Sequence, residues 1–368
     1  DQTDMKKIRI NLDKKRSASH DICIGRGILD RAGLLMAKGN WGDRCFVVSD
    51  SIVAPLHGEK LLAVLAGTGL KADLVEIPAG ESSKSISAVA DLAGRLISLG
   101  ADRRSLLVAL GGGVVGDICG FTASVFMRGI PYVQLPTSLI AMVDSSIGGK
   151  TGVDLPSGKN LLGSFYQPKA VFMELDYLKT LPPREVVNGM AEIIKYGIID
   201  DPELFDLLES DLSRIIDRNL DHIERIVAKA VRIKKGIVEI DETEMGLRRI
   251  LNFGHTIGHA VEAESGFTVS HGHAVGLGIL GASLLSEKMN YLNPEENSRI
   301  ASLIRAAGLP VRLPAGLRPA GVLSRFRFDK KKEGGVNKFV LLKKIGMPFV
   351  HDGVSPDMIG NVIQELAT

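Results

Sequence analysis

Four of the eight histidines lie close together near the middle of the second half of the chain. His255 and His259 are four residues apart in FGHTIGHAVE, which places them on one face of a helix. His271 and His273 follow in SHGH, after a turn that contains glycine. Neutral imidazoles that converge in this way suit a zinc site, which usually needs a third protein ligand and an open position. Scattered surface histidines produce the same spacing, so both interpretations stay open.

A carboxylate for such a site is found in GMAEIIKYG, where Glu192 lies on a mainly apolar helix. An unpaired carboxylate is costly among apolar side chains, so Glu192 is a candidate third ligand. Lys195 follows one turn later on the same face. A simple pair between Glu192 and Lys195 is therefore the alternative.

The glycine-rich segment LGGGVVGD, residues 110–117, follows an apolar strand and opens a predicted helix. Glycines at this point let backbone N–H groups approach a pyrophosphate at the helix N-terminus. The segment does not match GxGxxG, and a tight turn with close helix–sheet packing is the alternative. Asp50, at the end of an earlier strand, could hold an adenosine ribose or cap the following turn.

Cationic and polar residues surround the small-residue run DSSIGGKTGVDLPSGKN and recur later in the chain. Several Lys and Arg side chains together would bind a phosphate and a carboxylate, although each alone is more often a solvated surface charge. Glycine accounts for 41 of the 368 residues, and many glycines flank these segments. We interpret much of this glycine excess as room for ligands to approach the backbone, at Gly111–Gly113, Gly116, Gly148–Gly149, Gly152, Gly158, Gly163, Gly254, Gly258 and Gly272.

The elements that must position these residues change in type along the chain. Apolar strands are predicted at 44–50, 72–81, 105–113, 132–142 and 170–176, with a helix at 86–100 between two of them. From Leu178 the pattern is helical: a helix after Pro183, a long helical stretch at 204–239 and a buried helix at 273–291, with a strand or hairpin at 337–346. We predict an α/β fold in which a Rossmann-like parallel-sheet domain, residues 1–177, precedes a mainly α-helical metal-binding domain, residues 178–368.

Composition excludes several other classes of protein. The 45 basic and 43 acidic residues give a formal net charge of +2, which argues against a nucleic-acid partner. The chain has neither an apolar run long enough for a membrane span nor a signal-peptide pattern at its start. The three cysteines are far apart and form no CxxC pair, which favours a reducing, cytoplasmic location.

Five long motifs, in this order, resemble the 3-dehydroquinate synthase family over roughly residues 21–346. They are PAGESSKS, LGGGVVGDICGF, RGIPYVQLPTSLIAMVDSSIGGKTGVDLPSGKNLLGSFYQP, LKTLPPREVVNGMAEIIKYG and LRRILNFGHTIGHAVE. The resemblance implies an NAD-binding N-terminal domain, a helical domain that carries the metal, and an active site in the cleft between them. It also implies a homodimer, because the residue that matches Arg128 is offered across the subunit interface in the family.

The resemblance assigns roles residue by residue. The implied ligands of Zn²⁺, or of Co²⁺ or another divalent metal, are Glu192, His255 and His271. The implied NAD contacts are Asp50, Gly80, Glu81, Lys84, Gly113, Val114, Val115, Gly116, Asp117, Thr137, Ser138, Lys159, Tyr177, Leu178, Lys179 and Thr180. The implied substrate-binding residues are Arg128, Asp144, Lys150, Asn160, Lys195, Lys234, Arg248 and Lys330. The implied catalytic residues are His259, Lys150, Lys195, Arg248, Asn252 and, for proton transfer, Glu244. The family usually has HGE where this chain has HGH, so His273 stands at the glutamate position and His271 is taken as the ligand by its place in the motif.

The reaction implied by the resemblance belongs to the shikimate pathway. The substrate, 3-deoxy-D-arabino-heptulosonate 7-phosphate, is transiently oxidised by NAD, loses phosphate by β-elimination, is reduced again and closes by an intramolecular aldol step to 3-dehydroquinate. The lysines, Arg128 and Asn160 would hold phosphate and carboxylate oxygens, and His259 would shuttle the hydroxyl proton.

Three alternatives stay open at this point. One is a related cyclase, an aminodehydroquinate synthase or a 2-deoxy-scyllo-inosose synthase; the segment DSSIGGKTG and the intact LPSGKN disfavour the latter. Another is a metal-dependent alcohol or glycerol dehydrogenase, which would need no phosphate clamp. The last is a non-catalytic NAD-binding protein, which the retained metal-ligand types and lysines disfavour.

Overall fold

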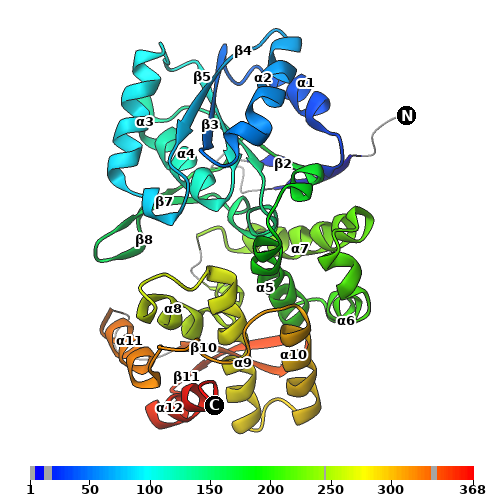
Figure 1. Ribbon diagram of the computed structural model, residues 1–368, viewed down its shortest axis with the longest axis vertical. Coiled ribbons are helices and arrows are strands. Elements are labelled where there is room, and N and C mark those ends of the chain that lie inside the picture. Colours follow the sequence, from blue (N-terminus) through cyan, green and yellow to red (C-terminus); the bar gives the residue numbers. More distant parts are fainter. Residues whose placement is uncertain (1–4, 12–18, 244–245, 333–337) are drawn as a thin grey trace. The chain divides into compact units, whose positions relative to one another are not determined.

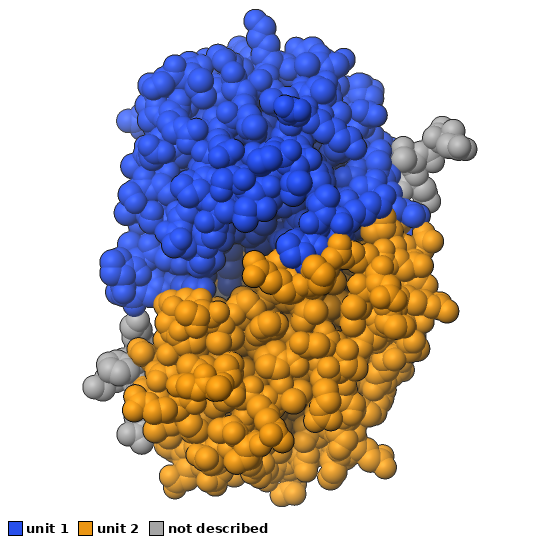
Figure 2. All heavy atoms as spheres, in the orientation of Figure 1, with its two compact units in different colours: residues 1–182 blue, residues 183–368 orange. Residues whose placement is uncertain are grey.

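The computed structural model describes residues 5–11, 19–243, 246–332 and 338–368, with the backbone alone described for 327–332. The chain divides into two compact units, Asp1–Pro182 and Pro183–Thr368, which Figure 2 colours separately.

The first unit is built on a seven-stranded sheet of order β1-β2-β9-β6-β5-β3-β4. All neighbouring pairs are parallel except β1 with β2, which is antiparallel. The strands are β1 (Lys6–Ile10), β2 (His20–Gly25), β3 (Arg44–Asp50), β4 (Lys71–Ile77), β5 (Ser105–Gly111), β6 (Tyr132–Pro136) and β9 (Ala170–Glu174). Each of the five predicted strands overlaps one of these, and β1 and β2 were missed.

Helices cover both faces of this sheet (Figure 1). They are α1 (Leu29–Gly39), α2 (Glu59–Gly67), α3 (Ile86–Ser98) and α4 (Gly113–Val125). A separate antiparallel hairpin, β7 (Lys150–Leu155) with β8 (Gly158–Phe165), packs against α4.

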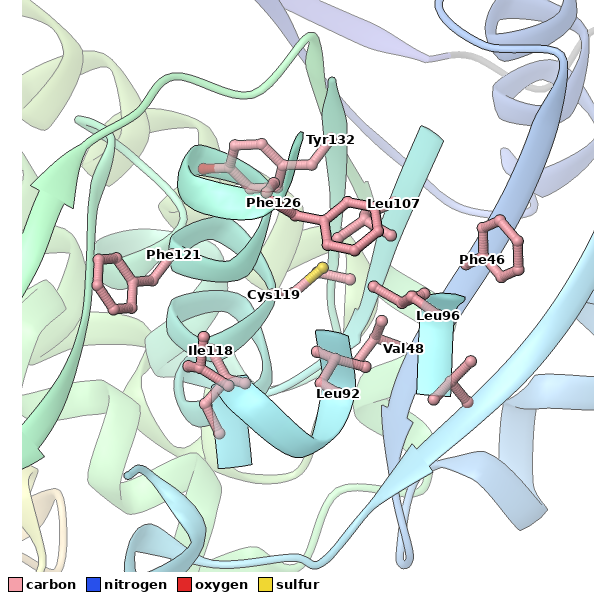
Figure 3. Close-up of a cluster of buried hydrophobic side chains, with 14 of the residues drawn as sticks. Phe46, Val48, Leu92, Leu96, Leu107, Ile118, Cys119, Phe121, Phe126 and Tyr132 are labelled. Carbon is pink, nitrogen blue, oxygen red and sulfur yellow. The ribbon is translucent and has the colours of Figure 1, made fainter. Parts of the chain in front are cut away.

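The core of the first unit lies where α3 and α4 pack on the central strands (Figure 3). Phe46 and Val48 are two residues apart on β3. Because successive side chains of a strand point to opposite faces, both lie on the face that meets the helices. Leu92 and Leu96 are one turn apart on α3 and present one apolar face to them. This packing holds the carboxyl end of β5 and the start of α4 in place, which is where the glycine-rich segment lies.

The second unit is mainly helical. Its elements are α5 (Pro183–Ile199), α6 (Pro202–Ile216), α7 (Leu220–Ile240), α8 (His255–Glu264), α9 (His271–Lys288), α10 (Pro294–Ala306), α11 (Pro319–Lys332), α12 (Pro356–Glu365) and the hairpin β10 (Lys338–Lys344) with β11 (Met347–Asp352). The predicted class, a Rossmann-like parallel-sheet unit followed by a mainly helical one, is confirmed. The predicted strand or hairpin is a hairpin; its first expected residue, Asn337, lies outside the described residues.

The stretch predicted as one long helical segment at 204–239 is two helices. Arg218 adopts a left-handed conformation with φ 61°, which ends the first. The side chain of Asn219 accepts hydrogen bonds from the N–H groups of Asp221 and His222 and so caps the second. The break lets α7 turn back and pack on α5 and α6.

Glycines allow α5, α8 and α9 to approach one another closely. A Cβ at Gly278 of α9 would lie 1.8 Å from the carbonyl oxygen of Gly254, and one at Gly258 of α8 would lie 3.0 Å from the carbonyl oxygen of Ala274. A Cβ at Gly272 would lie 2.0 Å from the carbonyl oxygen of Asn188 on α5. The interpretation of Gly254, Gly258 and Gly272 as room for ligands is therefore wrong, because backbone from a neighbouring segment fills that space.

Among the residues that the structure describes, no helix combines the length and the apolar composition that a membrane span requires.

We predict that Gly278→Ala lowers the free energy of unfolding by about 1–3 kcal/mol, as expected for overpacking. The added methyl would collide with backbone of Gly254, which cannot move aside as a flexible side chain can. Thermal and denaturant unfolding of the full chain measure the change.

Gly236→Ala on α7 is the matched control, because a Cβ there meets nothing within 4 Å. It should leave stability unchanged or raise it by up to about 1 kcal/mol, since alanine favours a helix interior over glycine. Equal stability of the two variants would contradict the close helix contact.

Candidate functional site

Three potential ligands from three different helices meet in the second unit. Glu192 lies in the middle of α5, and His255 and His271 are the first residues of α8 and α9. Oε1 of Glu192 is 3.4 Å from Nε2 of His255 and 3.4 Å from Nε2 of His271. Glu192 is fully buried, so this oxygen and the two ring nitrogens face one another inside the unit.

The two carboxylate oxygens of Glu192 have different surroundings. Oε2 accepts a hydrogen bond from Nζ of Lys195, which is also buried. Oε1 is buried and has no hydrogen-bond partner. The ion pair that the sequence left as an alternative thus exists, but it uses one oxygen and leaves the other directed at the histidines.

The second ring nitrogen of each histidine also faces an acceptor. Nδ1 of His255 is 3.3 Å from the backbone carbonyl oxygen of Phe253, and Nδ1 of His271 is 3.3 Å from Oε2 of Glu262. A carbonyl or carboxylate oxygen only accepts, so Nδ1 carries the proton in each neutral ring. Both Nε2 atoms then present lone pairs toward Oε1 of Glu192.

These residues fit a divalent metal ion. Ligand atoms about 2.0–2.1 Å from a tetrahedral zinc are about 3.3–3.4 Å apart, close to the separations from Oε1 to the two Nε2 atoms. A buried oxygen without a partner costs free energy unless a cation or a donor completes it. Two imidazole nitrogens and one carboxylate oxygen are a donor set for zinc or a similar metal that keeps an open position.

The electrostatics of the cluster favour an added positive charge. Burial raises the pKa of Glu192, but Lys195, His255 and His271 outweigh it and hold that pKa well below its ordinary value. Burial lowers the pKa of His271, but the carboxylates of Glu192 and Glu262 raise it to about 10. A metal cation would compete with this proton for the site.

The other two histidines are placed differently. His259 is exposed; its ring centroid is 5.3 Å from that of His255 and 6.2 Å from that of His271. It belongs to a second group of potential ligands with Glu262 and His271. Among the described residues, His273 is in neither group, so the structure brings His271 rather than His273 to Glu192.

Three cations of the predicted substrate set are buried in the second unit: Lys195, Lys234 and Arg248 are 1%, 5% and 2% exposed. The guanidinium of Arg248 donates a hydrogen bond to the carbonyl oxygen of Glu242, and this bond orients the side chain. Asn252 ends the same turn and is half-buried. Glu244 and the side chain of Lys330 lie outside what the structure describes.

The first unit holds the remaining polar residues of the substrate set. Arg128 (φ 69°) and Asn160 (φ 55°) both adopt the left-handed conformation that non-glycine residues rarely take. Such strain is concentrated at functional sites. Lys150 begins β7 and is exposed, and Asp144 is half-buried.

The structure confirms tight helix–sheet packing at the glycine-rich segment, and pyrophosphate binding there stays a prediction. A Cβ at Gly111 would lie 2.5 Å from Val115, and one at Gly116 would lie 2.8 Å from Gln134, so these two glycines permit tight helix–sheet packing. Gly112 is the N-cap of α4, and no side chain of that residue accepts a hydrogen bond from the first N–H groups of the helix. At Gly112 and Gly113 the nearest contacts of a Cβ are serine side chains, and the start of α4 is thus suited to an anionic group.

Charged residues of the predicted cofactor set pair beside this segment. Lys84 contacts Asp117 at 2.5 Å and donates to Oδ1 of Asn160 at 2.6 Å. Lys159 contacts Glu81 at 3.2 Å. Burial raises the pKa of Asp117 to about 6 even though Lys84 opposes the shift. Two segments of the predicted cofactor set, near residues 80–84 and 113–117, are therefore connected in the first unit.

Asp50 caps the turn after β3, because its Oδ1 accepts the N–H groups of Ile52 and Val53, both at 2.9 Å. Asp50 therefore acts as the cap that the sequence left open as one of its two possible roles.

The other members of the predicted cofactor set lie in the first turn of α4, just after β4 or β6, or in the turn after β9. Val115 is buried in the core, so only its backbone is available to a ligand. Thr180 is 2.9 Å from Nε2 of His57 through its hydroxyl. Gly80 has a φ of 98°. Val114 and Ser138 are half-buried, and Thr137 is buried. The turn after β9 contains Tyr177, Leu178 and Lys179.

Sequence reasoning missed several residues that hold the site together. Asn188 accepts the N–H of Gly272 through Oδ1 at 2.6 Å and so caps α9 from α5. Glu262 faces His271, and His57 faces Thr180. A signal existed only for Glu262, which is seven residues after His255 and so lies on the same helical face.

Comparisons with known proteins bear on this arrangement. The model of the 3-dehydroquinate synthase N-terminal region matches residues 74–188, and that of the C-terminal region matches residues 189–332. The 3-dehydroquinate synthase of Caulobacter vibrioides (strain NA1000 / CB15N) is 46% identical over 340 residues, which are 90% of this chain and 92% of that protein.

Two solved structures are similar over nearly the whole chain. The 2-epi-5-epi-valiolone synthase of Streptomyces hygroscopicus subsp. jinggangensis 5008, with NAD+ and Zn2+ bound, is 31% identical with a TM-score of 0.88, over 95% of this chain and 96% of that one. A 2-deoxy-scyllo-inosose synthase complexed with carbaglucose-6-phosphate, NAD+ and Co2+ is 27% identical with a TM-score of 0.89, over 98% and 99%. Both family models, the curated relative and the order of the motifs lead to one conclusion: the chain belongs to the 3-dehydroquinate synthase family.

Proposed function

We propose that this chain converts 3-deoxy-D-arabino-heptulosonate 7-phosphate to 3-dehydroquinate and phosphate, with no net oxidation or reduction. The single observation that carries the proposal is the cluster of Glu192, His255 and His271, with its buried, unpartnered oxygen. It lies in a chain whose curated relatives are 3-dehydroquinate synthases.

The first unit would hold NAD and the second the metal. The start of α4 and the paired segments near Lys84 and Asp117 would receive the dinucleotide, which supplies a transient hydride acceptor. Glu192, His255 and His271 would hold a zinc or cobalt ion, which supplies Lewis-acid polarisation of a substrate hydroxyl. The bound NAD+ with Zn2+ or Co2+ in the two similar cyclase structures supports this assignment.

The protein's own residues would bind and orient an anionic sugar acid. Buried Lys195, Lys234 and Arg248 provide positive charge where water is largely excluded, which strengthens their attraction to phosphate and carboxylate oxygens. A small neutral alcohol needs no such charges, so these residues favour a sugar acid phosphate over a dehydrogenase substrate. His259 is exposed and adjacent to the cluster, so it can exchange a hydroxyl proton with solvent. Lys150, Asn160, Asp144 and Arg128 would complete the substrate set from the first unit.

We also propose a homodimer in the cytoplasm. Val125, Met127 and Phe165, each at least 38% exposed, lie at the end of α4, in the turn after it and at the end of β8, where Ser164 contacts Ser124 and Tyr166 donates to the carbonyl oxygen of Ile130. Val125 and Met127 closely precede Arg128 in the chain, and Arg128 is exposed and held in a left-handed conformation. Apolar side chains of this size gathered on one surface are typical of an interface. All three cysteines are buried and free, as in a reducing compartment.

We predict that phosphate is released from the heptulosonate phosphate with catalytic amounts of NAD, and that no NADH accumulates. The hydride taken from the substrate returns to it, so each turnover regenerates NAD. Phosphate release and the NADH absorbance band are followed together, with and without a chelator. The chelator should stop the reaction, and added Zn²⁺ or Co²⁺ should restore it. NADH formed one-to-one with product would instead identify a dehydrogenase.

We predict that His271→Ala abolishes both zinc binding and activity while the chain stays folded. The substitution removes one of three ligand atoms from the cluster, and two are too few to hold the ion tightly. Zinc content after gel filtration, phosphate release and circular dichroism are measured together. His273→Ala is the control and should retain zinc and most activity, because His273 lies outside both ligand groups among the described residues. Full zinc loading of His271→Ala would refute the ligand assignment.

We predict that the wild-type chain sediments as a dimer and that Val125→Glu shifts it toward monomer with loss of activity. A charge on the apolar surface beside Arg128 would be buried without a partner in the interface. Ile97→Glu on α3 changes a comparably exposed side chain away from this surface and should stay dimeric. A fully active wild-type monomer at micromolar concentration would contradict the dimer.

A further inference from the structure

The imidazole of His271 lies between two buried carboxylates. Its Nε2 is 3.4 Å from Oε1 of Glu192, and its Nδ1 is 3.3 Å from Oε2 of Glu262. Glu192 is fully buried and Glu262 is 3% exposed, so neither carboxylate is well screened by water. One side of the ring therefore faces the proposed metal position, and the other faces a charge that no proposed ligand or catalytic role explains.

The two histidines of the cluster differ in this respect. Nδ1 of His255 faces a neutral backbone carbonyl, that of Phe253. Nδ1 of His271 faces an anion. A carboxylate holds an Nδ1–H more strongly than a carbonyl does and makes the opposite nitrogen a better electron donor. His271 is thus the ligand whose orientation and basicity depend on a side chain that can be replaced.

The fold places Glu262 at this point through the contact between α8 and α9. His255, His259 and Glu262 are at positions i, i+4 and i+7 of α8 and share one face. The close approach at Gly258 and Gly278 brings that face against the start of α9, where His271 lies. The backbone carbonyl of Glu262 accepts the N–H of Phe267 at 2.8 Å, which ties the residue to the end of its helix.

We propose that Glu262 is a positioning residue for the metal ligand His271. It accepts the Nδ1–H, selects the tautomer with a free Nε2 lone pair and fixes the ring plane toward Glu192. The inference rests on the proposed metal ligands, Glu192, His255 and His271. It goes beyond them because it assigns the metal affinity in part to a residue that does not touch the metal.

The test measures the zinc affinity of the full chain by competition with a chromogenic chelator. Glu262→Gln should weaken zinc binding about 10–100-fold, the usual cost of losing such a partner. The amide removes the charge, and its NH₂ group can donate to Nδ1 and select the wrong tautomer. The visible spectrum of the Co²⁺-loaded variant should also differ from that of the wild type. Saturating zinc should restore much of the activity, which it would not do if Glu262 served only to hold the fold.

Glu264→Gln is the matched control. Glu264 is on the same helix and pairs with Arg325 at 3.2 Å rather than with a histidine. It loses the same charge two residues away and should keep wild-type zinc affinity and the wild-type Co²⁺ spectrum.

The outcomes separate this inference from the proposed function. If the wild type binds no zinc, or His271→Ala keeps it, the proposed metal site fails and this inference fails with it. If the wild type binds zinc through His271 but Glu262→Gln has unchanged affinity and an unchanged Co²⁺ spectrum, only the role of Glu262 is overturned. Should Glu262→Gln not fold, Glu262→Asp decides, because its shorter side chain draws the carboxylate away from Nδ1. If the zinc affinity of Glu262→Asp lies between those of the wild type and His271→Ala, the proposal is supported. If it equals that of the wild type, the proposal is overturned.

Discussion

The candidate site depends on the close backbone contact of three helices. Gly272 meets the carbonyl of Asn188, and Gly278 meets that of Gly254, so α5, α8 and α9 approach nearer than any side chain would allow. Asn188 adds a hydrogen bond to the N–H of Gly272 and secures the first turn of α9 to α5. Glu192, His255 and His271 come from these three helices, and their spacing follows from that contact. A ligand set spread over separate helices needs such rigid packing, because a shift of half an ångström between helices changes the geometry around a metal.

The same helix contact buries the carboxylate of Glu192, and the side chains around it offset the cost of that burial. A fully buried carboxylate is unfavourable alone, and Glu192 has Lys195 at one oxygen and two imidazoles near the other. Lys195 and the two histidines hold the pKa of Glu192 low, yet one carboxylate oxygen stays without a hydrogen bond. A divalent ion at that oxygen would join the three ligands and remove the remaining cost. Stability of the second unit and its proposed chemistry thus draw on the same few residues.

The sequence predicted the elements well and their contacts less well. Apolar runs such as Ser105–Gly111 identified the strands, because buried parallel strands have a distinctive composition. The edge strand β1 (KKIRI) alternates charged and apolar residues, and the short inner strand β2 (HDICIG) begins with two polar residues, so neither has that composition and both were missed. The helical stretch after Leu204 gave no warning of the break at Arg218 and Asn219, since a short polar turn resembles an exposed helix face. The ligand types were predictable from motifs, but the role of Asn188 and the proximity of Glu262 were not, because they depend on contacts between helices far apart in the sequence. Gly254, Gly258 and Gly272, which looked like space for ligands, proved to be contacts between backbones.

The central claim is that one divalent metal is held by Glu192, His255 and His271 from three helices. X-ray absorption at the zinc edge of the loaded protein reports the ligand types and distances directly. We expect two imidazole nitrogens and one carboxylate oxygen at about 2.0–2.2 Å, with any further ligand a light atom from water or substrate. A coordination shell that contains sulfur, or one with no imidazole scattering, would contradict the claim.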